Sequence, residues 1–181
     1  GVPYSDPGMD GPVIQQAVDP AVRAGVGMRD ALRAVAAVSS AGAAAVIMSY
    51  WNPIEHYGVK RFAADLAAAG GSGAITPDLI PDEAGPWLAA TDAHDLDRIF
   101  LVAPSSTDAR LRSTVEACRG FVYAASTMGV TGVRAAVGGA AQVLVERARS
   151  AVPGFPVCVG LGVSNAAQAA EVAAFADGVI V

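Results

Sequence analysis

Short apolar runs alternate with amphipathic stretches along the whole chain, and this alternation constrains the fold more than any other feature. The runs are too short and too apolar for strands that expose one face, so we expect six buried strands. Buried strands separated by helices are typical of a parallel sheet, either doubly wound or closed as a barrel. The pattern alone does not choose between the two. The expected strands are Ala44–Ser49, Gly73–Thr76, Arg98–Ala103, Phe121–Ala125, Pro156–Leu161 and Asp177–Val181.

The stretches between these runs carry apolar residues at helical spacing. Pro12 and Pro81 suit the first turn of a helix, Ser164 suits an N-cap, and Gly70-Gly71 ends a helix. The last long helix before the Pro156–Leu161 strand is expected to reach Ala151. The apolar positions are Met28, Leu32 and Val35; Phe62 and Leu66; Leu111 and Val115; Val143 and Leu144; and those within Ala167–Phe175.

Composition favours one domain and narrows the class of partner. The chain has 181 residues, of which 53% are apolar and 16% charged, enough for a sizeable core in a single domain over residues 1–181. A net charge of −5 and a pI of about 4.8 argue against nucleic-acid binding, which needs clustered Lys and Arg. The expected partners are small molecules or proteins.

Nothing in the sequence indicates export, a membrane or a metal. Cys118 and Cys158 are too few for a disulfide scaffold and are interpreted as structural thiols in a reducing cytosol. The apolar run Ala41–Trp51 is too short to span a bilayer, so we expect a cytoplasmic protein. His56 and His94 have no partner ligand at i+4, and neither is interpreted as a metal ligand.

Four segments carry a resemblance to a known family. They are Gly1-Val-Pro-Tyr-Ser-Asp-Pro-Gly-Met-Asp-Gly-Pro12, Met128-Gly-Val-Thr-Gly132, Ile75-Thr-Pro-Asp-Leu-Ile-Pro-Asp-Glu83 and Phe100-Leu-Val-Ala-Pro-Ser-Ser-Thr-Asp108. Together they resemble the signature segments of the tryptophan synthase alpha subunit, a lyase, and the match runs essentially end to end.

The resemblance implies a parallel (β/α)8 barrel and so chooses between the two kinds of parallel sheet. Such a barrel has about 250 residues and eight strands. We therefore expect an internal segment of the barrel, in which the first two strands and the last helix are missing. The family's catalytic glutamate, just upstream of Gly1, and its Gly-Ser phosphate contact, after the final strand, lie outside residues 1–181.

The resemblance places the catalytic aspartate at Asp10. The family cleaves indole-3-glycerol phosphate by retro-aldol chemistry, and this aspartate interacts with the indole N–H. A positioned proton-transfer group is worth roughly 10²–10⁴-fold in rate. The structural alternative is an Asx-turn before Gly11-Pro12. Asp6, which precedes Pro7, is expected to organise the loop or a subunit interface rather than to act in the chemistry.

Two glycine-containing loops are expected to bind the substrate phosphate. By resemblance, Thr131 meets the catalytic aspartate when a lid closes, and Gly132 contributes to phosphate binding. The second element is Gly160-Leu-Gly162 before a helix, where free N–H groups and the helix dipole favour an anion. A plain βα turn has the same local pattern.

The resemblance also places Tyr50, Leu101 and Tyr123 in the wall of the indole-glycerol pocket. Apolar walls with a few hydroxyls suit an indole joined to a polyol. The alternative is that residues at strand ends are barrel core. Pro77 stands where the family often has a small residue, which leaves the shape of the pocket open.

In the family, the catalytic face docks on the tryptophan synthase beta subunit, and indole passes to the pyridoxal phosphate site of that partner. This chain is therefore expected to hold no cofactor of its own. Trp51 is interpreted as an exposed interface anchor, with a Trp tucked under its own loop as the alternative.

The sequence thus predicts a lyase that yields indole and glyceraldehyde 3-phosphate in the last steps of tryptophan biosynthesis, with the isolated 181 residues inactive. One alternative is a non-catalytic barrel fragment with a structural or partner-binding role. The other is a related phosphate-binding barrel isomerase or synthase.

Overall fold

The computed structural model describes residues 1–126 and 138–181. The chain divides into two compact units. The first contains Gly1–Pro7 and Gln15–Ile99, and the second contains Gly8–Ile14 and Phe100–Val181. Helix α1 (Pro12–Arg23) includes residues of both units.

The first unit is a parallel three-stranded sheet with helices between its strands. Its strands are β1 (Val46–Met48), β2 (Gly73–Ile75) and β3 (Asp97–Ile99), in that order across the sheet. In register, Val46 faces Gly73, and Gly73 faces Asp97. The helices are α2 (Met28–Ser40), α3 (Trp51–Tyr57), α4 (Val59–Ala68), the 3-10 turn η1 (Pro81–Glu83) and α5 (Gly85–Ala93).

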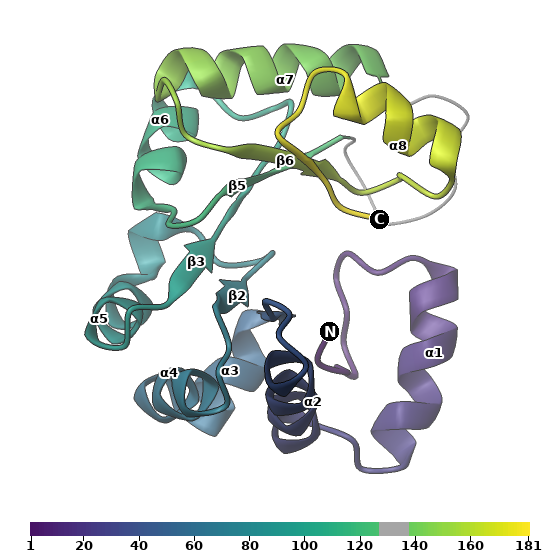
Figure 1. The fold of residues 1–181 in the computed structure, drawn as a ribbon, viewed down its shortest axis with the longest axis vertical. Coiled ribbons are helices and arrows are strands. Elements are labelled where there is room, and N and C mark those ends of the chain that lie inside the picture. The colour runs from purple at the N-terminus through teal and green to yellow at the C-terminus, as the bar shows by residue number, and fades with distance from the viewer. Residues whose placement is uncertain (127–137) are drawn as a thin grey trace. The chain divides into compact units, whose positions relative to one another are not determined.

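The second unit is a parallel four-stranded sheet built on the same alternation. Its strands are β4 (Leu101–Val102), β5 (Val122–Ala125), β6 (Val157–Gly160) and β7 (Gly178–Val179), again in chain order. Helices α6 (Asp108–Ala117) and α7 (Gly138–Ala151) pack on each other and against the sheet, and α8 (Ala166–Ala173) packs against β7 (Figure 1). Parallel pairing throughout confirms the predicted sheet class.

All six predicted strand segments contain a strand, but the segment Arg98–Ala103 contains two. β3 pairs with β2, whereas β4 pairs with β5, and only Phe100 separates them. The Phe100 N–H donates to the Cys118 Sγ at 3.5 Å instead of to a neighbouring strand. The fully buried Phe100 thus marks the change of pairing partner.

The predicted apolar faces of α2, α4 and α6 are buried. The prediction for α7 is right for Leu144, which is buried, and wrong for Val143, which is 54% exposed. Ser164 is not the N-cap of α8, because the Asn165 side chain accepts from the Gln168 N–H and takes that role. The N-terminal proline positions and the helix end at Gly70 are confirmed.

No apolar stripe was predicted for helices α1, α3 and α5, although Pro12 was expected in the first turn of a helix. Pro20 lies inside α1, and α3 has seven residues, too few for a clear apolar stripe. The first unit packs its core around Trp87 of α5, whose ring lies 5.7 Å from that of Phe62.

Candidate active site

Tyr50 follows β1 and Gly160 is the last residue of β6, so both lie at the carboxyl ends of parallel strands, where ligands bind in α/β sheets. Leu101 and Tyr123 differ from the expected strand-end position, because Leu101 begins β4 and Tyr123 lies inside β5. In the second unit, Leu101 of β4 faces Tyr123 of β5 in register, and Ala125 of β5 faces Gly160 of β6. The structure therefore brings Leu101, Tyr123 and Gly160 together on three neighbouring strands. Asp10 belongs to this same unit, through the segment Gly8–Ile14.

Asp10 lies in the loop directly before α1 and is half-buried. Its burial contrasts with that of Asp6, which is exposed and accepts a hydrogen bond from its neighbour Ser5 at 2.6 Å. A half-buried carboxylate is better suited to hold a substrate N–H than an exposed one, because water competes less for its hydrogen bonds.

Tyr50 follows β1 in the first unit and is buried, with 8% of its surface exposed. Its ring lies 5.4 Å from that of Tyr4, and the Tyr4 hydroxyl accepts from Asn52 Nδ2 at 2.9 Å. The start of the chain is also tied to β1 by the Val2 N–H, which donates to the Met48 carbonyl at 2.9 Å. These contacts fix the Tyr4 loop beside Tyr50.

Tyr123 is 3% exposed, and its hydroxyl lies against the backbone of β6. Burial raises the pKa of Tyr123, and a backbone hydrogen bond with Leu161 opposes that rise. The phenol therefore stays protonated at neutral pH and remains available as a donor. Leu101 is half-buried beside it in the register.

The turn after β6 has an unusual backbone. Leu161 has φ 64° and Gly162 has φ 111°, so both lie in the left-handed region. Leucine rarely adopts this conformation, because its Cβ crowds the following carbonyl. The pattern Gly-Leu-Gly indicated a tight turn, but it did not show that the middle residue is left-handed as well.

The free backbone donors of this turn lie after Gly160. The Ser164 N–H and hydroxyl both donate to Gln168 Oε1, at 2.9 and 3.0 Å. Among the described residues, the N–H groups of Gly162 and Val163 have no hydrogen-bond acceptor. Two adjacent free N–H groups before a helix suit an anionic oxygen.

Ser126 is a residue of this site that the sequence did not reveal. It follows β5, is 2% exposed, and bonds to the Gly160 and Leu161 carbonyls. The other expected contributors, Thr131 and Gly132, lie outside the described residues.

Trp51 is half-buried, so the expectation of an exposed side chain is wrong. The Trp51 ring meets that of Trp87 edge-on at a centroid distance of 6.4 Å, and the Trp51 backbone N–H donates to Asp78 Oδ1 at 2.9 Å. The packing partner Trp87 belongs to the core of the first unit, which favours a packed Trp51 over an exposed interface anchor.

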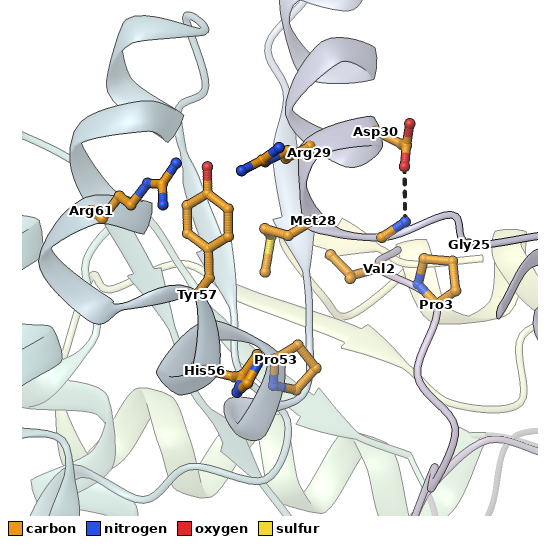
Figure 2. A pocket seen from close by; sticks show the side chains of 11 residues that line it. Val2, Pro3, Gly25, Met28, Arg29, Asp30, Pro53, His56, Tyr57 and Arg61 are labelled. Atoms are coloured by element: carbon orange, nitrogen blue, oxygen red, sulfur yellow. Dashed lines mark hydrogen bonds between the residues drawn. The ribbon is translucent and has the colours of Figure 1, made fainter.

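A cavity of about 450 Å³ opens in the first unit, away from the predicted site residues. The ring of Tyr57 lies between the side chains of Arg29 and Arg61 (Figure 2), with the Arg61 guanidinium 4.7 Å from the ring centroid. The Tyr57 hydroxyl donates to Asp65, and the Gly27 N–H donates to Asp30. The lining is Val2, Pro3, Gly25, Gly27, Met28, Arg29, Asp30, Pro53, His56, Tyr57 and Arg61.

The titratable residues elsewhere form no metal site in residues 1–126 and 138–181. His56 and His94 are exposed. Cys118 is buried, and burial raises the pKa of the half-buried Cys158 thiol, with Asp177 adding to the effect. No described helix is long and apolar enough to cross a membrane.

Comparison with known proteins gives one family over the full chain. The family model described as tryptophan synthase alpha chain matches residues 1–181. The tryptophan synthase alpha chain of Thermobifida fusca is 68% identical over 183 residues, covering 100% of this chain and 68% of that protein. The corresponding protein of Mycobacterium tuberculosis H37Rv is 67% identical over 181 residues, covering 100% and 67%.

Solved structures agree with the sequence relatives. A structure of Mycobacterium tuberculosis tryptophan synthase superimposes with a TM-score of 0.92 at 64% identity, covering 98% of this chain and 68% of that chain. A mutant tryptophan synthase alpha-subunit from Pyrococcus furiosus gives a TM-score of 0.85 at 31% identity, covering 99% and 72%. The fold is the parallel (β/α)8 barrel of these proteins, of which the chain spans about two thirds.

Proposed function

The chain belongs to the tryptophan synthase alpha chain family, and on that premise we propose how its residues cleave indole-3-glycerol phosphate to indole and glyceraldehyde 3-phosphate. One observation carries the assignment of the site. Tyr123, Gly160 and the free N–H groups of Gly162 and Val163 gather at the carboxyl edge of one parallel sheet. This edge offers a buried phenol for the organic part of the substrate and backbone donors for its phosphate.

Asp10 is proposed as the catalytic aspartate. In the retro-aldol step, indole C3 gains a proton and the glycerol hydroxyl loses one. The bond that breaks joins indole C3 to the glycerol carbon that carries this hydroxyl. A carboxylate that accepts from the indole N–H stabilises the positive charge that C3 protonation places on the ring. The half-burial of Asp10 supports this role, because partial desolvation strengthens the interaction.

The substrate phosphate is proposed to bind at Gly160 and Gly162, with Gly132 as a further contact. The free N–H of Gly162 supports this assignment, and the dipole of the eight-residue helix α8 adds to the attraction for an anion. At Gly160 the expected contact is close approach of the backbone. Thr131 is proposed to meet Asp10 from the lid.

Tyr50, Leu101 and Tyr123 are proposed to line the indole-glycerol pocket. The burial of Tyr50 and Tyr123 supports both this role and the alternative of barrel core. The protonated phenol of Tyr123 favours the pocket, because its hydroxyl reaches Gly160, the last residue of β6.

The proposed protein partner is the tryptophan synthase beta subunit, in a heterotetramer located in the cytoplasm. Pyridoxal phosphate belongs to that partner, and the alpha chain needs no cofactor for a retro-aldol cleavage. We further propose that residues 1–181 form a single barrel domain, and that this segment alone is inactive because the family's catalytic glutamate lies outside it.

A direct assay tests the proposed reaction. A full-length form that contains these residues, incubated with indole-3-glycerol phosphate, is expected to release indole and glyceraldehyde 3-phosphate in equal amounts. Addition of the beta subunit should raise the rate if docking orders the catalytic face. Turnover of the substrate to any other product would assign the chain to a related barrel isomerase or synthase.

A further inference from the structure

We propose that Ser126 is a positioning residue for phosphate binding, because it holds the Gly160–Gly162 turn in the conformation that presents the Gly162 N–H to the ligand. The inference rests on the proposed function, since the ligand is the substrate phosphate. Ser126 touches neither substrate nor reacting atoms in this account and acts only through the turn.

Ser126 binds two successive carbonyl groups of the turn. Its N–H donates to the Gly160 carbonyl at 2.9 Å, which continues the pairing of β5 with β6. Its hydroxyl donates to the Leu161 carbonyl. Only 2% of Ser126 is exposed, so water does not compete for either bond.

These two bonds determine where the next N–H groups point. A peptide group is planar and trans, so its carbonyl and its N–H point in opposite directions. The bond to the Leu161 carbonyl therefore directs the Gly162 N–H away from Ser126. The preceding backbone group, that of Leu161, interacts with the Tyr123 hydroxyl and lowers its pKa. The Gly162 N–H is thus the first donor of the turn that remains free for a ligand.

The hydroxyl is needed because the turn is strained. Leu161 has φ 64°, and a leucine persists there only when its surroundings hold it. Leu161 is also buried, with 6% exposed, so its side chain and its carbonyl are both held in place. Loss of the hydroxyl allows the Leu161–Gly162 peptide to rotate towards an ordinary conformation, and the Gly162 N–H turns with it.

The test compares Ser126→Thr with Ser126→Val in a full-length form. The two side chains have nearly the same shape, and only threonine keeps the hydroxyl. Calorimetry measures the affinity for glycerol 3-phosphate and for indole, and steady-state kinetics gives KM and kcat for indole-3-glycerol phosphate. We expect the Val variant to bind glycerol 3-phosphate at least ~10-fold more weakly than the Thr variant, with KM raised by a similar factor and kcat within about 2-fold.

The affinity for indole, which has no phosphate, should be equal in the two variants. Equal affinity of the variants for glycerol 3-phosphate overturns the proposal, and so does a parallel loss of indole binding, which signals a general packing defect. If the Val variant does not fold, Ser126→Cys replaces it, because the thiol is a weak donor of similar size. The Cys variant is then expected to bind glycerol 3-phosphate at least ~5-fold more weakly than the Thr variant. A protein with Ser126 intact that binds no glycerol 3-phosphate would instead overturn the proposed function.

Discussion

Gly160 is a glycine because Tyr123 occupies the space where a side chain would be. A Cβ at this position would lie 2.6 Å from Tyr123 Cζ, closer still to the hydroxyl oxygen, and 3.0 Å from the Ile180 Cβ. The sequence suggested that glycine here allows close approach of an anion, which stays a prediction. The structure adds a steric reason that does not depend on any ligand.

Replacement of Gly160 by alanine should therefore damage the site and the fold together. We expect Gly160→Ala to lower stability by about 1–3 kcal/mol, as overpacking does in a close-packed core, and to weaken binding of glycerol 3-phosphate. Thermal unfolding and calorimetry check the two effects. Gly139→Ala is the matched control, because nothing lies within 4 Å of a Cβ at that exposed helical position. Equal melting temperatures for the two variants would contradict the steric account.

At the scale of single residues, the sequence was most informative for residue types that serve few structural roles, such as an aspartate or a glycine in a loop. Asp10 and the glycines of the turn were identified as candidates, although their roles remain proposals. Ser126 could not be found in this way, because its hydroxyl acts on a carbonyl 35 positions further along the chain. Serine after a strand is too common for its position alone to indicate such a contact.

At the scale of elements, Asp177 joins the end of α7 to β6 and to the start of β7. Its carboxylate accepts from the Val157 N–H at 2.9 Å and from Arg149 at 2.9 Å. The backbone bond, with help from Arg149, lowers the pKa of Asp177 below its usual value. The carboxylate therefore stabilises the folded state above the unfolded pKa of about 4, and this contribution is lost as the pH falls through the lower folded value.

We expect Asp177→Asn to destabilise the protein at pH 7 by about 1 kcal/mol, a modest value because the side chain is 43% exposed and its ion pair is screened by solvent. The difference from the original protein should shrink as the pH falls below ~4 and through the lowered pKa of folded Asp177, below which both proteins carry a neutral side chain. Urea unfolding at pH 7 and pH 3 measures it. Asp19→Asn is the control. The Asp19 carboxylate lies 3.6 Å from the Arg23 guanidinium, and the two side chains are 70% and 77% exposed, so solvent screens this ion pair more strongly. Similar losses from both variants at pH 7 would contradict the account.

Strands were easier to predict than helices in this chain. The strands β1, β2, β5 and β6 lie in continuous apolar runs of the sequence, so they could be recognised without their neighbours. The division at Phe100 could not, because it depends on which strand each half pairs with. Helix α5 has buried Trp87, Ala90 and Thr91, but its sequence lacks a clear polar face, so its helical period was not evident.

At the scale of the whole molecule, residues 1–181 match about two thirds of the length of their relatives, which bears on what this segment can do alone. β1 is an edge of its sheet and β7 an edge of the other, and apolar side chains lie exposed on them or beside them, with Val46 39% and Val181 86% exposed. Exposed edge strands pair readily with other chains.

The isolated 181-residue polypeptide is expected to form no indole from indole-3-glycerol phosphate and to self-associate. An indole assay measures the activity, and sedimentation measures the self-association. A stable, cooperative monomer would show that the edges need no cover. Measurable indole would show that the family's glutamate is dispensable.

Asp10 is the proposed catalytic carboxylate, and a matched pair of variants tests this role most directly. Asp10→Asn and Asp6→Asn make the same chemical change in one loop, at a half-buried and an exposed position. The measurement is the rate of indole release from indole-3-glycerol phosphate by full-length protein, with glycerol 3-phosphate affinity measured in parallel. We predict at least a ~10²-fold loss of rate for Asp10→Asn, with phosphate affinity retained, and a rate near that of the original protein for Asp6→Asn. Unchanged turnover in Asp10→Asn would contradict the account and leave Asp10 as a turn former before α1.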